Sequence, residues 1–122
     1  MMNVGLLGAG RIACVHATAI TRHPESTLVA VSDYIPANSK KIAAEFGCAK
    51  RTTAEIIADP EIDAVLIATS TGTHSDLIEQ AVGAGKSVLC EKPVDLSLKR
   101  ARLCQSNTET AGLPVMIGFN RR

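Results

Sequence analysis

The chain has few aromatic residues and almost no excess charge, and both absences exclude a class of function. Only three of its 122 residues are aromatic, one Tyr and two Phe, and 13 basic residues stand against 12 acidic ones, for a formal net charge of +1. A surface that binds nucleic acid needs a basic face for phosphates and aromatic rings for bases. Nucleic acid is therefore not expected as a partner.

Long apolar runs and paired cysteines are missing too. No stretch approaches the roughly 18 apolar residues of a membrane-spanning helix, and residues 1–7 carry no positively charged leader. The four cysteines, Cys14, Cys48, Cys90 and Cys104, are widely spaced and form no Cys-x-x-Cys pair, which argues against a zinc site or a disulfide framework. We expect free, mostly buried thiols, no metal, no membrane partner and a cytoplasmic location.

The composition is that of one compact domain, because 46% of the residues are hydrophobic and 20% are charged. Short apolar runs typical of strands alternate with amphipathic, helix-like segments. Strands are predicted at residues 3–8, 27–33, 64–69, 87–90 and 114–119, with a brief edge strand at Lys50-Arg51. Helices are predicted after Gly10, with Ile12, Val15, Ala19 and Ile20 on one face, and at residues 36–47, 53–58, 73–83 and 97–112.

Residues at the helix ends support this alternation. Pro36 suits a first helical turn and Ser97 an N-cap, while Thr73 with Asp76 three residues later is typical of a capping box. Gly47 and Gly112 suit helix ends. Strands that are apolar throughout are typical of a parallel sheet covered on both faces. The sequence therefore predicts an α/β fold with a doubly wound parallel sheet, the Rossmann dinucleotide-binding fold, as a single domain over residues 1–122.

Gly8-Ala9-Gly10-Arg11-Ile12-Ala13 fits the pattern G-x-G-x-x-A between the first strand and the first helix. In a dinucleotide site Gly8 allows the tight turn, Gly10 lets a pyrophosphate approach the backbone, and the N–H groups at Arg11 and Ile12 face the phosphates. The alternative is a turn that merely needs glycine, which explains Gly8 but not Gly10.

Asp33 ends the second predicted strand, 23 positions after Gly10, where a carboxylate accepts the hydroxyl groups of an adenine ribose. A carboxylate there repels a 2′-phosphate, and the next residue is Tyr34 rather than an arginine that could bind one. NAD is therefore favoured over NADP as the cofactor.

Two further loops follow strands at the ligand-binding edge of such a sheet. Thr69, Ser70 and Thr71 could line the nicotinamide half of the cofactor, or form a Ser/Thr-rich turn that leads into a capped helix. His74 could act as a base, or be a surface or capping residue.

Glu91-Lys92-Pro93 follows the fifth predicted strand, where proline fixes the chain after the lysine. The Lys92 ammonium could hydrogen-bond a substrate hydroxyl and favour the alkoxide that develops during hydride removal, with Glu91 pairing with it or holding the loop.

The chain resembles the glucose-fructose oxidoreductase / inositol dehydrogenase / MocA family, in "GLLGAGRIACVHA", Asp33, "ATSTGTHSDLIEQAVGAGKSVLCEKPVDLSL" and "MIGFNRR". The resemblance implies an NAD-dependent enzyme that oxidises a secondary hydroxyl of a cyclic polyol or sugar. It places Lys92 at the substrate as the catalytic residue, and residues 69–74 around the nicotinamide. It further implies that Asn120 and Arg121 lie beside the cofactor, and that Pro93 follows a cis peptide bond.

Family members continue into a second α/β domain that supplies the acid/base pair and most of the substrate pocket, and this chain stops at Arg122. Three alternatives stay open: the cofactor-binding part of a polyol dehydrogenase, a stand-alone dinucleotide-binding or sensing module, and an inactive assembly of the domain. We expect a homo-oligomer, because apolar side chains near Met116, Phe119 and the helix from Ser97 would be uncovered without the second domain.

Overall fold

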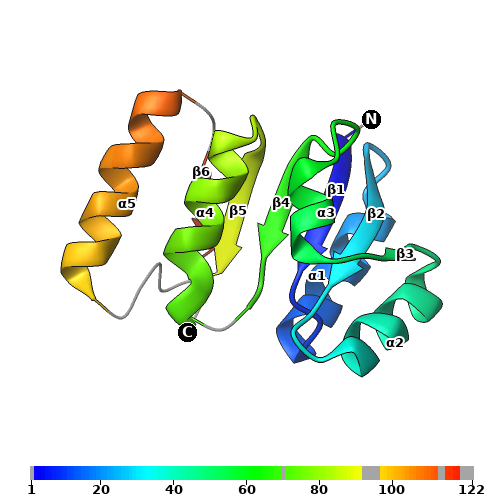
Figure 1. The fold of residues 1–122 in the computed structure, drawn as a ribbon. Coiled ribbons are helices and arrows are strands. Elements are labelled where there is room, and N and C mark those ends of the chain that lie inside the picture. The colour runs from blue at the N-terminus through cyan, green and yellow to red at the C-terminus, as the bar shows by residue number, and fades with distance from the viewer. Residues whose placement is uncertain (1, 70, 92–96, 113–114, 119–122) are drawn as a thin grey trace.

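The computed structural model describes residues 2–69, 71–91, 97–112 and 115–118, which form one six-stranded sheet with helices on both faces (Figure 1). Its order is β3-β2-β1-β4-β5-β6 and every described strand pair is parallel, which confirms the predicted doubly wound Rossmann fold. The strands are β1 (Met2–Leu7), β2 (Ser26–Ser32), β3 (Ala49–Lys50), β4 (Ala64–Ile67), β5 (Ser87–Glu91) and β6 (Val115–Gly118). The helices are α1 (Arg11–Arg22), α2 (Pro36–Phe46), α3 (Thr53–Ala58), the 3₁₀ turn η1 (Thr71–Thr73), α4 (His74–Gly83) and α5 (Leu98–Ala111).

Successive strand residues bury their side chains on opposite faces of the sheet. Leu6 and Leu66 belong to the core beneath α1 and α2, whereas Leu7 and Ile67 belong to the core beneath α3, α4 and α5. This is why the strands are apolar throughout: both faces are packed. The strand order changes direction at β1, which lies between β2 and β4. The loops that follow β1 and β4 therefore lie side by side at the carboxyl edge of the sheet.

The buried face of α1 differs from the prediction. Ala13, Ala17 and Ile20 pack on the sheet, while Ile12 is 51% exposed and Val15 64% exposed. Ala19, expected on the buried face, is exposed as well. The helix therefore approaches the sheet through Ala13 and Ala17 as well as the predicted Ile20, while Ile12 and Val15 point away from it, which periodicity alone does not reveal.

The helix ends are mostly as predicted. Gly47 and Gly112 take left-handed backbone conformations, and the Ser97 hydroxyl accepts the N–H of Arg100 at 3.3 Å. The prediction of a capping box at Thr73 is wrong, because the Thr73 backbone is helical and its side chain makes no capping hydrogen bond.

A capping box forms instead at the start of α3. The Thr52 hydroxyl accepts the N–H of Glu55, and the Glu55 carboxylate accepts the N–H of Thr52. The hydrogen bond from the Thr52 backbone lowers the pKa of Glu55. The edge strand is Ala49–Lys50, one residue before its predicted position.

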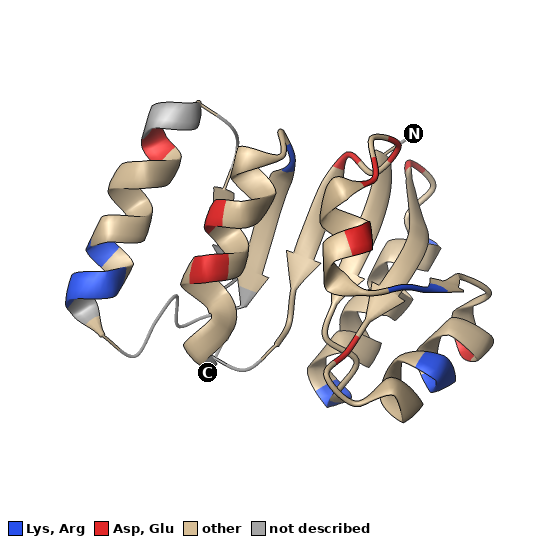
Figure 2. Ribbon diagram, in the orientation of Figure 1, with Lys and Arg blue, Asp and Glu red and all other residues tan. Residues whose placement is uncertain are grey.

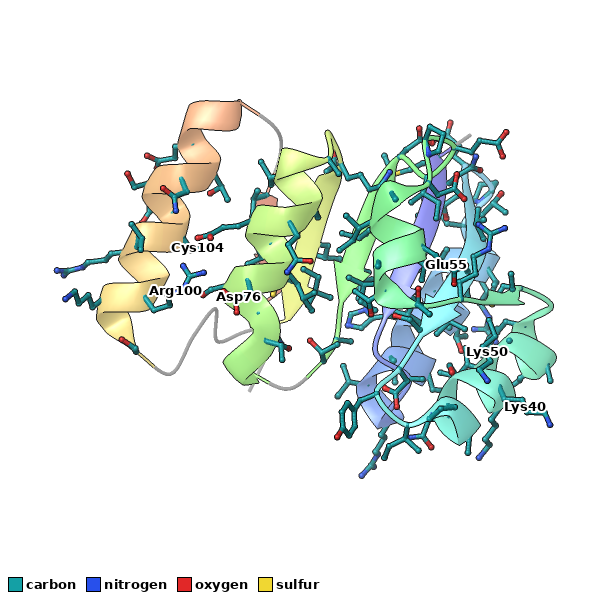
Figure 3. The ribbon with its side chains drawn as sticks, viewed as in Figure 1. Lys40, Lys50, Glu55, Asp76, Arg100 and Cys104 are labelled. Atoms are coloured by element: carbon teal, nitrogen blue, oxygen red, sulfur yellow. The ribbon has the colours of Figure 1, made fainter. Side chains whose placement is uncertain are left out.

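The basic side chains of Lys86 and Arg100 each join two segments of the chain, away from the ligand-binding edge. Lys86 is buried before β5, and its Nζ donates to the carbonyls of Asp59 at 2.6 Å and Ile62 at 2.8 Å. Arg100 on α5 pairs with Glu79 and Asp76 on α4, both at 2.7 Å (Figure 3). This pairing lowers the pKa of the Glu79 carboxyl, so its contribution to stability is present at neutral pH and is lost as the pH falls.

Basic and acidic residues are interspersed over the elements in the view of Figure 2. Within the described part of the chain, no helix is long and apolar enough to cross a membrane. All four cysteines are free thiols, with Cys90 and Cys104 buried and Cys14 and Cys48 partly buried.

Candidate functional site

The candidate site lies at the carboxyl ends of β1, β2 and β4, where three loops are joined by main-chain hydrogen bonds. The N–H of Gly8 donates to the carbonyl of Ser32 at 2.8 Å, and the N–H of Ala68 donates to the carbonyl of Leu7 at 2.7 Å. These bonds continue the ladders of the parallel sheet past its last paired residues. The loop after β1 is therefore held between the loops that follow its two neighbours.

The fold of the chain requires a glycine at position 8, whether or not a ligand is bound. Its φ is +104°, a conformation that residues with a side chain rarely adopt. A Cβ at this position would also collide with the carbonyl group of Ala68, whose carbon lies 2.7 Å from the Cβ position. The turn and the close approach of β4 both need glycine here, as the sequence pattern predicts.

Gly10 is different, because none of the residues that the structure describes requires glycine there. Its backbone has φ −83° and ψ −163°, and a Cβ would meet no atom within 4 Å. It is the N-cap of α1, whose first helical hydrogen bond is donated by Cys14, so that the N–H groups of Arg11, Ile12 and Ala13 lie outside the helical ladder. An uncovered backbone at a helix start fits a phosphate group.

Asp33 lies directly beside this loop and receives several N–H groups. Its Oδ1 accepts the N–H of Ala9 at 2.8 Å, and its Oδ2 accepts the N–H of Ile35 at 2.9 Å. The side-chain amide of Asn38 on α2 donates to Oδ2 at 3.3 Å. Tyr34 is 98% exposed and leaves the carboxylate accessible from the solvent side. The carboxylate is thus fixed at the place where the pattern predicts a ribose.

Asn38 was not singled out by the sequence. It lies five residues beyond Asp33 in the first turn of α2, and an Asn side chain there reaches back to the end of the preceding strand. An Asn five residues after an aspartate that ends a strand is the one sequence signal that could have predicted this contact.

The loop after β4 is organised by His74. The imidazole is only 2% exposed, and its Nε2 is 2.9 Å from the carbonyl oxygen of Thr69. The hydroxyl groups of Thr69 and Thr73 lie 2.7 Å apart across the same loop. His74 is therefore a buried residue beneath the loop, not the surface residue considered from the sequence.

Several predicted site residues lie outside the described residues: Ser70, Lys92, Pro93, Asn120 and Arg121, with the predicted cis bond before Pro93. For Thr71 and Glu91 the structure gives the backbone only, in η1 and at the end of β5. Both positions belong to the carboxyl edge of the sheet, Thr71 after β4 and Glu91 at the end of β5.

Residues 2–119 match the family model described as "Oxidoreductase family, NAD-binding Rossmann fold". The chain belongs to this family. The match covers the glycine-rich loop, Asp33 and the loop after β4 together, so the domain is an NAD-binding domain of the inositol dehydrogenase-like oxidoreductases. The resemblance inferred from the motifs is thereby confirmed.

Similar proteins are longer than this domain. An inositol 2-dehydrogenase of Rhizobium meliloti is 49% identical over 118 residues, which are 97% of this chain and 36% of that protein. The crystal structure of a scyllo-inositol dehydrogenase from Lactobacillus casei, with bound NAD(H) and scyllo-inositol, superposes with a TM-score of 0.90 at 29% identity, over 97% of this chain and 36% of that one. The domain therefore spans little more than a third of these relatives.

The fold alone does not select the dinucleotide. A biliverdin reductase from Synechocystis, crystallised with biliverdin and NADP+, also superposes with a TM-score of 0.90, at 32% identity over 95% of this chain and 37% of that one. Selection between NAD and NADP must therefore come from the residues at the ribose position.

Exchanging the two glycines for alanine separates their roles. Gly8→Ala should lower the free energy of unfolding by about 3 kcal/mol, because it adds a strained φ and a clash with the Ala68 carbonyl. Gly10→Ala should cost less than about 1 kcal/mol of stability but weaken NAD binding about tenfold or more, because only a ligand needs that space.

Urea denaturation measures the first effect and calorimetric titration with NAD the second. Unchanged NAD affinity in a folded Gly10→Ala variant would show that no ligand approaches the backbone there.

Proposed function

We propose that the domain serves an enzyme that oxidises a secondary hydroxyl group of a cyclic polyol or sugar, with NAD as the hydride acceptor. The observation that carries the proposal is the pairing of an open helix start at Gly10 with the fixed carboxylate of Asp33, which gives one place each for a pyrophosphate and a ribose. The polyol substrate is inferred from the inositol dehydrogenases named among the relatives.

At the phosphate end, backbone groups do the binding. We place the pyrophosphate over Gly8 and Gly10, against the N–H groups of Arg11 and Ile12 at the positive end of α1. No acidic residue lies in the first turn of α1 to oppose an anion. The Arg11 side chain is exposed and adds positive charge at the same end.

At the ribose end, we propose that Asp33 both holds the neighbouring loops and accepts a hydroxyl group of the ribose. A carboxylate has about four acceptor positions, so the donors from Ala9, Ile35 and Asn38 leave room for a ribose hydroxyl. A 2′-phosphate would be repelled by this carboxylate, and the residue that follows Asp33 is Tyr34 rather than an arginine that could bind the phosphate. NAD is therefore proposed as the preferred dinucleotide.

At the reactive end, the proposal relies on the family resemblance. Thr69, Ser70, Thr71 and Glu91 are proposed to line the nicotinamide, with Pro93, Asn120 and Arg121 beside it. Lys92 is proposed as the catalytic residue, whose ammonium orients the substrate hydroxyl and stabilises the alkoxide as the hydride leaves.

His74 has a different proposed role. Because it is buried and bound to the Thr69 carbonyl, we assign it to holding the nicotinamide loop rather than to taking a proton. A lysine ammonium is ordinarily protonated at neutral pH, so a base for the hydroxyl proton is expected from residues outside this domain.

A second candidate function is a stand-alone module that binds or senses a dinucleotide without catalysis. The open helix start at Gly10 and the fixed carboxylate of Asp33 support this candidate equally, because they would bind a dinucleotide whether or not catalysis follows. Turnover by the complete gene product distinguishes the two candidates, because the 122-residue chain by itself is expected to be inactive in either case. For either, we propose a cytoplasmic location, which the four free thiols favour.

The first prediction concerns the ribose. The domain should bind NAD more tightly than NADP, and Asp33→Ala should weaken NAD binding by about tenfold to a hundredfold, through the loss of about 1.5 to 3 kcal/mol of charge-assisted hydrogen bonding. Calorimetric titration with both dinucleotides checks it.

Asp63→Ala is the matched control, because that carboxylate accepts the N–H of Asn3 at the opposite edge of the sheet. Equal affinities of the unmodified domain for NAD and NADP would refute the assignment of Asp33 to the ribose.

The second prediction concerns catalysis. The 122-residue chain should bind NAD but form no measurable NADH with myo-inositol at pH 8 to 9. Without a general base the rate falls by about 10² to 10⁴, and missing substrate positioning costs several kcal/mol more. Absorbance of NADH over hours at high protein concentration is the assay, with the Rhizobium meliloti enzyme as positive control.

A clear rate that disappears in Lys92→Ala would contradict this prediction and assign the base to Lys92. A rate that disappears in His74→Ala, in a variant that still binds NAD, would instead assign it to His74.

The third prediction concerns assembly. We propose that the 122-residue chain forms a homo-oligomer through the α5 side of the sheet, where Leu103 is 54% exposed. Light scattering at high micromolar concentration should give at least a dimer mass, and Leu103→Glu should reduce it. A strict monomer at those concentrations would refute the proposal.

A further inference from the structure

The Asp33 carboxylate is held by hydrogen bonds to both of its oxygens. Oδ1 accepts the N–H of Ala9 at 2.8 Å, and Oδ2 accepts the N–H of Ile35 at 2.9 Å. A third donor is the side-chain amide of Asn38, whose Nδ2 lies 3.3 Å from Oδ2. The first two donors belong to the backbone, which almost any residue supplies. The third is a side chain and therefore depends on the residue at position 38.

These three donors occupy the two carboxylate oxygens unequally. Each oxygen of a carboxylate has about two acceptor positions. The N–H of Ile35 and the amide of Asn38 take both positions of Oδ2, whereas the N–H of Ala9 takes one position of Oδ1. The open acceptor position therefore lies on Oδ1, the oxygen that is bonded to the glycine-rich loop.

The first turn of α2 fixes the place of the Asn38 amide. Pro36 begins the helix, and the N–H of Asn38 donates to the carbonyl of Ile35 at 3.0 Å. The next residue, Ser39, is buried, and its hydroxyl donates to the carbonyl of Pro36 at 3.1 Å. Asn38 itself is half-buried. Because the backbone around it is held in this way, the short side chain reaches Asp33 from a defined position.

The amide of Asn38 orients the carboxylate without neutralising its charge. An amide N–H donates a hydrogen bond but carries no net charge, whereas a lysine or arginine at this position would form an ion pair with Asp33. The first turn of α2 holds no acidic residue, and the positive end of the helix favours a carboxylate beside it. The negative charge of Asp33 is therefore left to repel a 2′-phosphate.

We propose that Asn38 is a positioning residue for the choice of dinucleotide. Its amide fixes the orientation of the Asp33 carboxylate, so that Oδ1 accepts a ribose hydroxyl and the carboxylate rejects a 2′-phosphate. Asn38 acts through Asp33 and does not itself touch the dinucleotide. The inference rests on the proposed contact of Asp33 with the ribose, and it goes further by giving a residue of α2 a part in the preference for NAD.

Calorimetric titration of the 122-residue chain with NAD and with NADP tests this role. Asn38→Ala should weaken NAD binding about threefold to tenfold, because the carboxylate loses one of the hydrogen bonds that orient it. NADP binding should change by less than about twofold, because a ligand that Asp33 repels gains nothing from the orientation of the carboxylate. The preference for NAD should therefore narrow, whereas a general loosening of the fold would weaken both dinucleotides alike.

A double-mutant cycle separates positioning from direct contact. In a chain that already carries Asp33→Ala, the further change Asn38→Ala should alter NAD affinity by less than about 1.5-fold, since the carboxylate that Asn38 holds is gone. A cooperative thermal transition in each variant establishes that it is folded.

Asn107→Ala is the matched control. The Asn107 amide on α5 donates to Glu79 Oε2 on α4 at 3.2 Å, so this variant loses the same kind of bond away from the site. It should leave the affinities for both dinucleotides unchanged.

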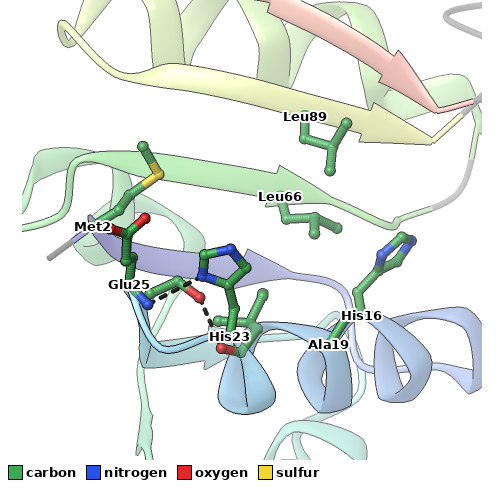
Figure 4. Close-up of a pocket in the computed structure, with 9 residues that line it drawn as sticks. Met2, His16, Ala19, His23, Glu25, Leu66 and Leu89 are labelled. Atoms are coloured by element: carbon green, nitrogen blue, oxygen red, sulfur yellow. Dashed lines mark hydrogen bonds between the residues drawn. The ribbon is translucent and has the colours of Figure 1, made fainter.

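A groove beside α1 supplies a second control (Figure 4). This hollow has a volume of about 600 Å³ and is lined by Met2, His16, Ala19, Ile20, His23, Glu25, Ser26, Leu66 and Leu89. Ala19 is exposed in the wall of the groove, away from Asp33, so Ala19→Glu should leave NAD binding unchanged. Loss of NAD binding in Ala19→Glu but not in Asn38→Ala would place the dinucleotide in the groove and overturn the proposal.

The remaining outcomes separate this inference from the proposed function. If Asp33→Ala lowers NAD affinity and Asn38→Ala does not, the ribose contact stands and the role of Asn38 is refuted. That role is also refuted if Asn38→Ala weakens NAD and NADP equally, or if its effect persists in the Asp33→Ala chain. If Asp33→Ala leaves NAD affinity unchanged, the proposed ribose contact is wrong and the inference fails with it.

Discussion

The carboxylate of Asp33 joins the two loops on which the whole site depends. One oxygen holds the N–H of Ala9 in the glycine-rich loop, and the other holds the N–H of Ile35 after β2. Apart from this bridge, the loop after β1 is held on that side by the hydrogen bond from the N–H of Gly8 to the carbonyl of Ser32. The group proposed to recognise the ribose is therefore also part of the framework that places the helix start under the phosphates.

The proposed contact of Asp33 with the ribose would give this common fold a preference for one dinucleotide. The parallel sheet brings the ends of β1, β2 and β4 together in any protein with this topology, and the relatives of this fold include proteins crystallised with NAD(H) and with NADP+. Discrimination must come from charge and shape at the ribose. Here a fixed carboxylate, followed by an almost fully exposed tyrosine, supplies negative charge and no cation of its own.

The order of the elements could be predicted from the sequence because each strand is apolar throughout and each helix end carries its own local signal. The turn at Gly8 and the places of Gly10 and Asp33 at this edge of the sheet could be predicted for the same reason, because they follow from backbone geometry next to a strand. The predictions that failed concern features that depend on tertiary contacts. The buried side of α1, the missing cap at Thr73 and the burial of His74 are decided by neighbouring loops and by the sheet. Asn38 was missed because its partner comes from a different element.

The central claim, that a dinucleotide binds across the carboxyl edge of the sheet between the α1 start and Asp33, is tested most directly by NMR. In a titration of the ¹⁵N-labelled domain with NAD, the account predicts that the largest shift changes fall on the backbone amides of Ala9, Gly10, Ile12 and Thr69. The amides of Lys86 and His23, which lie away from this edge, should stay unchanged. Changes concentrated at Lys86, His23 or the groove beside α1, with none in the glycine-rich loop, would contradict it.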